Sequence, residues 1–191
     1  MALGGIDSTE VRIAPNGGIF VAPSLTAAPT DVTTPLSASW TNLGYASEDG
    51  VTLSHSVDLN DIKAWQTAVP VKRGLSGVSL EVKFSLLQTD KETVAFYWAG
   101  SSWVNGPAGV ATLSVPSNPS ISSMEHALCI EYTDDAGSIQ RLYCGRGIVS
   151  DRDDISLKRD DAVMYGVTFV AFDNNGSLAK LLSNSTELYS S

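Results

Sequence analysis

The sequence predicts a mainly β protein that forms a single domain over residues 1–191. Its 191 residues suffice for one sizeable core and are few for two. Apolar residues make up 43% of the chain and charged residues 17%, and Ser, Thr, Gly and Val are abundant, a balance that favours strands over helices. Apolar and polar residues alternate in several segments, whereas only one segment has the start and stop signals of a helix.

The first forty residues predict a hairpin followed by an irregular segment. Residues 11–22 contain two short apolar runs around Pro-Asn-Gly-Gly at positions 15–18, a composition typical of a hairpin turn. Residues 23–39 contain three prolines and many Thr, Ser and Ala residues. Such a segment buries too little to pack as an element of its own, so we expect an extended loop or arm.

A turn and a half-buried strand follow. Glu48 and Asp49 stand between a stretch that contains Trp and Tyr and a segment in which every second residue from Val51 to Val57 faces the same side. Two adjacent carboxylates could serve acid/base chemistry or a metal. Since no base, metal ligand or nucleophile accompanies them in the sequence, we interpret them as exposed acids of a turn that begins the strand.

Residues 58–76 predict a long excursion between two paired strands. Pro70, Gly74 and Gly77 are hard to place in a central strand, whereas apolar residues alternate regularly from Val78 to Leu86. Loops of this length are usually functional or disordered.

One helix is predicted, over residues 89–100. Thr89 at the N-cap and Glu92 at the third helical position have the spacing of a capping box, and Gly100 suits the C-terminal stop. The face expected to pack on the sheet consists of Val94, Tyr97 and Trp98.

The second half of the chain predicts a link, three strands and a tail. Residues 101–120 are rich in Pro, Gly and Ser and indicate a link. Strands are expected within residues 125–133, 138–150 and 162–172, with a charged turn at 151–161 before the last of them. Residues 177–191 are interpreted as a C-terminal tail.

Cys129 and Cys144 flank a predicted hairpin turn at residues 133–138. A loop of two or four residues would place them opposite each other, whereas a loop of three or five residues would place them on opposite faces. The sequence leaves this register open. We expect both cysteines to be reduced and to pack as small apolar groups.

The chemistry of the sequence favours neither an enzyme nor a metal protein. His55 and His126 have no third partner at metal-ligand spacing, and residues 151–161 lack the ligand order of a calcium loop. No nucleophile elbow or phosphate-binding glycine loop occurs. We therefore expect no catalytic residues, no metal and no cofactor.

The charge and hydropathy of the chain restrict its partners. A formal charge of -9 and a pI near 4.5 argue against tight binding of nucleic acid phosphates. No apolar run approaches membrane-spanning length, and the N-terminus lacks a basic segment followed by an apolar one. We expect synthesis in the cytosol and no membrane insertion.

Several phrases of the sequence, taken in order, resemble a known family. "LGYASEDGVTLS", "DIKAWQ", "VSLEVKFSLLQTDKETVAFYWAG" and "YGVTFVAFDNNG" are similar to the major tail (tail tube) proteins of long-tailed double-stranded DNA phages, especially siphophages of actinobacterial hosts. The similarity runs over roughly residues 10–176.

The resemblance implies a fold and a function. The fold is a β-sandwich or small barrel of two packed antiparallel sheets with one short flanking α-helix. The function is that of a structural virion protein whose hexameric rings stack into a tail tube through which DNA is ejected. Implied partners are further copies of the chain and the tail terminator, tape measure and baseplate or tip proteins. The protein would be assembled in the host cytoplasm and reside in the virion tail, and DNA would pass through without specific binding.

The resemblance also leads to two hypotheses, one about the residues that contact a neighbouring subunit and one about the residues that line the tube. The excursion at 58–76 would contact a neighbouring subunit or ring, through Trp65, Val71, Arg73 and Leu75. Six chains of charge -9 would carry about -54 per ring, which would keep DNA from adhering to the tube wall. Candidate lumen or turn acids are Glu48, Asp49, Asp58, Asp61 and Glu81.

Two alternative functions remain open at this stage. A β-sandwich that binds glycans or decorates a capsid predicts a discrete monomer or trimer with an aromatic-lined patch. A hydrolase, the less favoured alternative, predicts a deep pocket with a carboxylate of shifted pKa.

Overall fold

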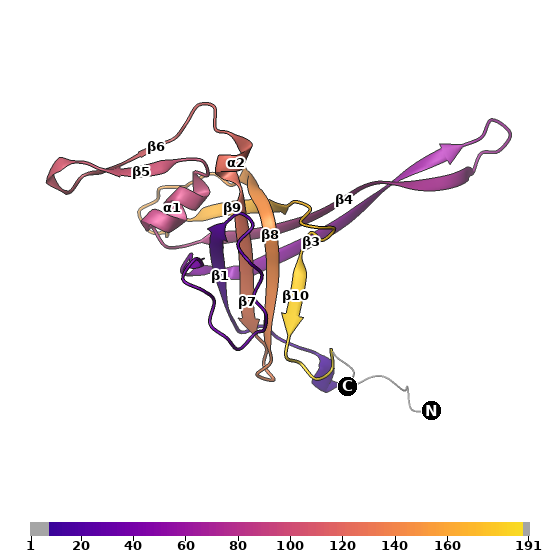
Figure 1. The fold of residues 1–191 in the computed structure, drawn as a ribbon, viewed down its shortest axis with the longest axis horizontal. Helices are drawn as coiled ribbons and strands as arrows, with labels where there is room; N and C mark the ends of the chain where they lie inside the picture. The colour runs from indigo at the N-terminus through magenta and orange to yellow at the C-terminus, as the bar shows by residue number, and fades with distance from the viewer. Residues whose placement is uncertain (1–7, 189–191) are drawn as a thin grey trace.

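The computed structural model describes residues 8–188, in which strands dominate and helices are few. This agrees with the mainly β fold predicted from the sequence. The antiparallel strands of the main sheet are β1 Asn16–Pro23, β2 Thr41–Asn42, β3 Ala46–Lys63, β4 Pro70–Leu86, β7 His126–Thr133, β8 Ile139–Arg152, β9 Tyr165–Ala171 and β10 Lys180–Ser183. They lie in the order β2-β1-β7-β8-β9-β4-β3, and β10 pairs with β8 (Figure 1).

The two expected layers are the two halves of this one sheet. The first half of β8 pairs with β10 through residues 140–143, and its second half pairs with β9 through residues 147–152. In Figure 1, β1, β7 and β10 lie roughly along one axis, and β3, β4 and β9 lie across it. Gly147 lies where β8 passes from one partner to the other, and a Cβ there would collide with the carbonyl oxygen of Val170.

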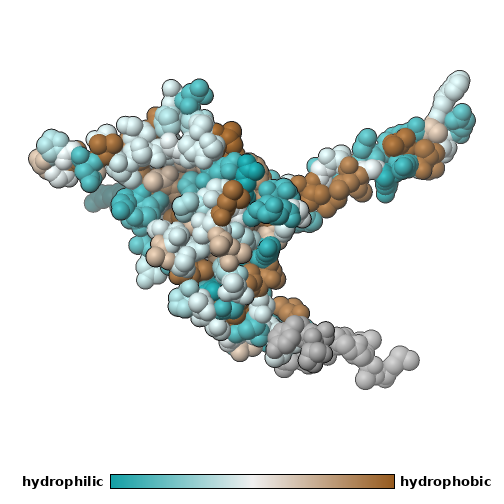
Figure 2. All heavy atoms as spheres, viewed as in Figure 1, coloured by the Kyte–Doolittle hydropathy of each residue, from teal (hydrophilic) through white to brown (hydrophobic). Residues whose placement is uncertain are grey.

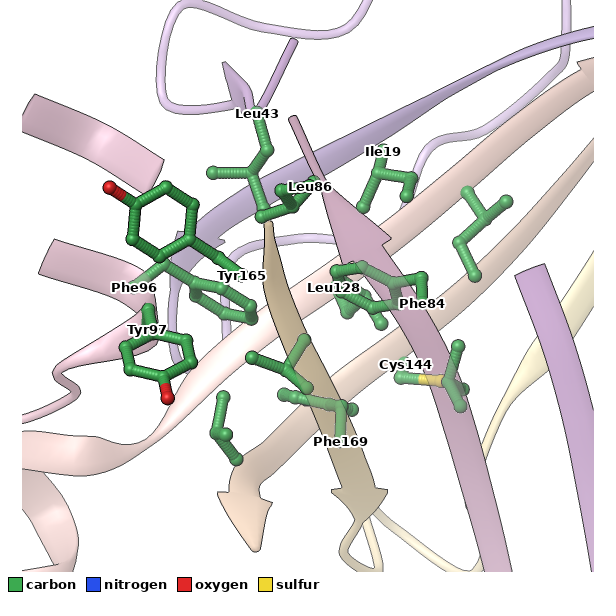
Figure 3. Close-up of a cluster of buried hydrophobic side chains, with 14 of the residues drawn as sticks. Ile19, Leu43, Phe84, Leu86, Phe96, Tyr97, Leu128, Cys144, Tyr165 and Phe169 are labelled. Carbon is green, nitrogen blue, oxygen red and sulfur yellow. The ribbon is translucent and has the colours of Figure 1, made fainter. Parts of the chain in front are cut away.

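A single apolar core lies between the halves. It includes Leu128 of β7, Phe169 of β9 and Phe84 of β4, each at most 2% exposed (Figure 3). The core therefore holds together strands that are distant in the sequence, as in a sandwich.

The helix α1, Lys91–Tyr97, closes one side of the core. It begins one residue later than the sequence predicted, because the Asp90 carboxylate, and not the Thr89 hydroxyl, accepts the hydrogen bond from the Thr93 N–H at 2.8 Å. The buried face is also rotated: Phe96 stacks on Phe84, whereas Trp98 is 37% exposed. A second helix, α2 Ile121–Met124, is a single turn.

The predicted hairpin at residues 11–22 was wrong. Residues 16–23 form the single strand β1, and residues 11–15 pass the β7–β8 turn, where the Ile13 N–H donates to the Asp135 carboxylate. A Cβ on Gly17 would lie 2.9 Å from the backbone carbonyl oxygen of Glu131 on β7. The glycine therefore permits close strand approach and does not form a turn.

The predicted link at residues 101–120 contains a hairpin that forms a separate two-stranded sheet. It consists of β5 Ser102–Asn105 and β6 Ala111–Ser114, joined through the 3-10 turn η2 Pro107–Gly109. The Trp103 indole N–H donates to the Lys91 carbonyl at 2.9 Å, which attaches the hairpin to α1. In Figure 1 this hairpin projects on the side opposite to the end of β3 and β4.

The segment from residue 24 to residue 40 has no regular secondary structure but is held on the sheet by polar contacts. The Arg141 guanidinium donates to the carbonyls of Asp31 and Thr34 at 2.7 and 2.8 Å, and the Tyr143 hydroxyl donates to the carbonyl of Thr26. Hydrogen bonds from side chains of β8 therefore hold this segment on the sheet, although it buries few apolar side chains of its own.

The tail predicted at residues 177–191 contains the strand β10, and residues 189–191 lie outside the described part of the chain. These residues form a strand and not a free tail because they pair with β8, Lys180 with Tyr143 and Ser183 with Gln140. Ahead of β1, residues 8–10 form a short 3-10 turn, η1 Ser8–Glu10. No helix within residues 8–188 has both the length and the apolar character needed to cross a membrane.

Candidate assembly interface

The main feature outside the core is a long β-hairpin that we call the arm, residues 57–78. Strands β3 and β4 pair from Ala46↔Leu86 to Lys63↔Pro70, but β4 pairs with β9 only through residues 81–86. Beyond that point the two strands leave the body of the molecule together (Figure 1). The sequence predicted an excursion at 58–76, and the structure shows that these residues continue the two strands and turn only between Lys63 and Pro70.

Glycine and proline are accommodated in the arm because it has only two strands. Asp58 pairs with Gly77 and Leu59 with Leu75, so that Ser76 is an extra residue on β4. Pro70 is the first residue of its strand. Both features are tolerated at bulges and strand ends, so the glycine and proline residues that predicted an irregular excursion are compatible with two paired strands.

One face of the arm is apolar. By strand alternation, this face continues the core-facing side of the sheet outward into solvent (Figure 2). Its apolar side chains are between 45% and 66% exposed, and they are Leu53 at the base with Val57, Leu59, Val71, Leu75 and Val78 along the arm. An exposed apolar surface of this kind, interrupted by His55 and by the Asp61–Arg73 pair, marks an interaction surface.

The four residues predicted to make intersubunit contacts all lie on the arm. Trp65 is in the terminal turn and is 100% exposed, and Val71 and Leu75 are 57% and 66% exposed. Arg73 pairs with Asp61 across the two strands, with Nε and Oδ1 2.8 Å apart. The sequence did not single out Val57 and Val78, because their alternation indicated half-buried strands without showing that no second layer covers them, and it did not single out Leu59 within the predicted excursion.

The opposite face of the arm and its base is polar. Ser56 and Ser79 hydroxyls are 2.7 Å apart across the strands, and Lys83 pairs with Asp153 at 3.2 Å. Asp58 and Glu81 share this face by alternation. Two of the five candidate acids are therefore brought onto one surface.

The structure separates the remaining acids. Asp61 lies on the apolar face and is neutralised by Arg73. Glu48 and Asp49 do not form the predicted turn; they lie in a bulge of β3, between the pairs Ala46↔Leu86 and Val51↔Phe84. Gly50 has φ +66°, a conformation that glycine adopts without strain, and it completes this bulge.

The geometry offers little for catalysis or metal binding in residues 8–188. Among them, no group of three His, Cys, Asp or Glu residues could hold a metal ion. His55 is exposed on β3, and His126 lies with Nδ1 2.9 Å from the Met124 carbonyl oxygen. Burial lowers the pKa of His126 below its ordinary value, so that it is neutral at pH 7.

Both ends of the main sheet are open within the described chain. β3 is the last strand at one end and the two-residue strand β2 is the last at the other. An uncovered edge strand presents backbone donors and acceptors to another chain. The open edge of β3 and the apolar face of the arm together form the candidate interface.

The family model for "Phage tail tube protein" matches residues 4–190. The chain belongs to the phage tail tube protein family. A tail tube protein is a structural component of the phage tail, and the resemblance to tail tube proteins noted in the sequence is thereby confirmed, whereas the type of phage and its host stay predictions. No curated protein matches the sequence.

Among solved structures, this tail tube protein is similar to two chains of contractile injection systems. One belongs to the sheath-tube complex of an extracellular contractile injection system, PVC, in the extended state, with 12% identity, a TM-score of 0.43 and coverage of 86% of this chain and 88% of that chain. The other belongs to the baseplate of the anti-feeding prophage, with 7% identity, a TM-score of 0.42 and coverage of 89% and 94%. With TM-scores below 0.5, they add nothing to the family assignment.

Proposed function

We propose that this tail tube protein assembles into hexameric rings, and that the rings stack into a tube through which the phage genome is ejected. The observation that carries the proposal is the arm, whose apolar face has no covering layer within residues 8–188. Two-stranded hairpins are marginally stable in water by themselves. A neighbouring copy that covered the arm would remove its apolar side chains from water and stabilise it.

The arm and the body it would contact are different surfaces of one chain, so the contact is heterologous. Heterologous contacts close into a ring or continue into an open filament. The free edge of β3 is available for pairing that would close a ring, and an arm that continues past the last residue paired with β9 supports contact beyond the body.

Partners at the two ends and inside the tube are part of the same proposal. A tube built from heterologous contacts exposes an unsatisfied surface at each end, so that other proteins must cap it. A tail terminator at one end and a baseplate or tip protein at the other would do so, and a tape measure protein would occupy the lumen. Assembly takes place in the host cytoplasm, and the protein has no enzymatic activity.

The polar face of β3 and β4 would line the tube. It is rich in hydroxyl groups, it carries Asp58 and Glu81, and its Lys83 is paired with Asp153. A ring of six chains carries a charge of about -54, and carboxylates facing the lumen would repel DNA phosphates. DNA would then slide without binding.

Electron microscopy of the purified protein at high concentration, together with its mass in solution, tests the proposal. We expect hollow tubes or rings from the wild-type protein. The double variant Trp65→Ala with Arg73→Glu should lose tubes, because it removes the largest apolar side chain of the arm and reverses a charge.

A matched control changes the same kinds of residue elsewhere. Leu157→Ala with Arg159→Glu also removes an exposed apolar side chain, 80% exposed, and one positive charge, but in the loop after β8. This variant should assemble like the wild type. Tubes of normal length from the Trp65 and Arg73 variant would contradict a role of the arm in assembly.

A further inference from the structure

A groove of about 660 Å³ opens on the side of the molecule where β3 faces the β1–β7–β8 half of the sheet. Its floor is made by apolar residues from both halves, namely Ile19, Val51, Leu53, Ile130 and Leu142. Residues 12–18 and 44–48 form its walls. The groove is therefore the open mouth of the sandwich, where core residues of the two halves meet solvent.

The rim of this groove carries uncompensated negative charge. Glu48 lines the groove and Asp49 follows it in the exposed bulge. Neither forms an ion pair within residues 8–188, whereas the deeper acids Glu131 and Asp134 are paired with Arg141 and Arg12. The free carboxylates can accept a cation from outside the chain.

The end of the arm has the complementary properties. Residues 59–75 contain three basic residues and one acidic residue, a net charge of +2 within a chain of net charge -9. Arg73 is paired with Asp61, but in the part of the chain that the structure describes Lys63 and Lys72 form no ion pair. Beside them lie the fully exposed Trp65 and the exposed Leu75.

We propose that the groove is the binding site for the arm end of a second copy of this tail tube protein, with Trp65 on the apolar floor and Lys63 and Lys72 against Glu48 and Asp49. The proposal rests on the proposed function, and it specifies which surface of the neighbour receives the arm. An arm cannot enter the groove of its own chain, because it points away from the body (Figure 1). Buried Trp side chains ringed by complementary charges are typical of the residues that dominate interface energies.

Disulfide trapping in assembled protein tests this contact. A chain with both Gln66→Cys and Ser47→Cys keeps Trp65 and carries one thiol beside it at the arm end and one in the groove wall. After mild oxidation of assembled material, we expect a ladder of linked chains beyond the dimer on a non-reducing gel. Each single variant should give dimers at most, because one new thiol can join only two chains. The native cysteines do not interfere, since both are free and buried.

A control pair places the second thiol on the polar face. Gln66→Cys with Ser54→Cys should give no ladder, because Ser54 lies on the opposite side of β3 from the groove floor. A ladder from this pair, or none from the Ser47 pair in intact tubes, would overturn the proposed site and leave tube formation as a function standing. Wild-type protein that never formed rings or tubes would overturn both.

Charge reversal provides a second measurement. Lys63→Glu with Lys72→Glu should reduce tube length, and adding Glu48→Lys with Asp49→Lys should restore it, because the pairs are then reversed together. Restoration supports direct pairing of the arm with the groove rim. Loss without restoration, or no loss at all, contradicts it.

Discussion

The thiols of Cys129 and Cys144 lie on opposite faces of the β7–β8 pair, because the turn between the strands has five residues. Cys129 is opposite Tyr143, and Cys144 is opposite Leu128 and belongs to the core cluster. Burial raises the pKa of each thiol to about 12. The packing of both thiols as buried groups agrees with the expectation from the sequence, and the register that the sequence left open places them where they cannot pair with each other.

These thiols should be unreactive in the native protein. Raising a thiol pKa from 9.0 to about 12 lowers the thiolate fraction at pH 8 about 1,000-fold, and the thiolate is the nucleophile. We expect negligible colour with a chromogenic disulfide reagent at pH 8 and two reacting thiols per chain in denaturant. If the thiols reacted as fast in the native protein as in the denatured protein, the two cysteines would not be buried as described.

At the scale of elements, the start of α1 shows how tertiary contacts select between two adjacent caps. Thr89 and Asp90 are both good N-cap residues. Asp90 has the extended backbone of a cap and its carboxylate accepts from the Thr93 N–H, while the Thr89 hydroxyl lies 3.3 Å from that of Tyr165. The buried face, which includes Phe96 and Tyr97, then follows from the helix start.

Substituting each of these two residues in turn should show which one caps the helix. Asp90→Ala should lower the free energy of unfolding by about 1 kcal/mol, because it removes the hydrogen bond to the first turn. Thr89→Ala should cost less, since its hydroxyl makes only a long contact. Urea unfolding of unassembled protein, followed by circular dichroism, measures both. Equal losses would contradict the assignment of Asp90 as the cap.

The arm also shows the limits of local signals at this scale. The sequence singled out residues 58–76 and four of their side chains, all of which lie on the arm. It predicted an irregular excursion because Pro70 and Gly74 are rare in central strands. It could not show that β4 leaves β9 at Glu81 and continues with β3 alone, since that depends on where the body of the sheet ends.

At the scale of the whole molecule, the chain separates its charges by surface. The arm end is positive, whereas the polar face of β3 and β4 carries Asp58 and Glu81. In the proposed assembly, a negative face toward the lumen and a positive arm end at a neighbour are compatible, because Asp58 and Glu81 lie nearer the base of the hairpin whereas Lys63 and Lys72 lie at its far end.

Reversing charge on the polar face should make tubes retain DNA. In Asp58→Lys with Glu81→Lys, phosphates would be attracted to the wall where the wild-type carboxylates repel them. Tubes assembled with short duplex DNA and then treated with nuclease should protect DNA only in this variant. Asp154→Lys with Asp160→Lys, the same charge change in the loop after β8, is the control. Equal protection by both variants would place the polar face outside the lumen.

The sequence by itself determined the mainly β class, the family, the single well-capped helix region and the segment that carries the arm. These follow from composition, from periodicity and from phrases that are local in the chain. Only the tertiary structure decided that one sheet forms both layers, that Asp61 is separated from Asp58, and that the groove beside Glu48 is open. Those properties depend on strand register and on which strand ends without a neighbour, and both are set by contacts between residues far apart in the sequence.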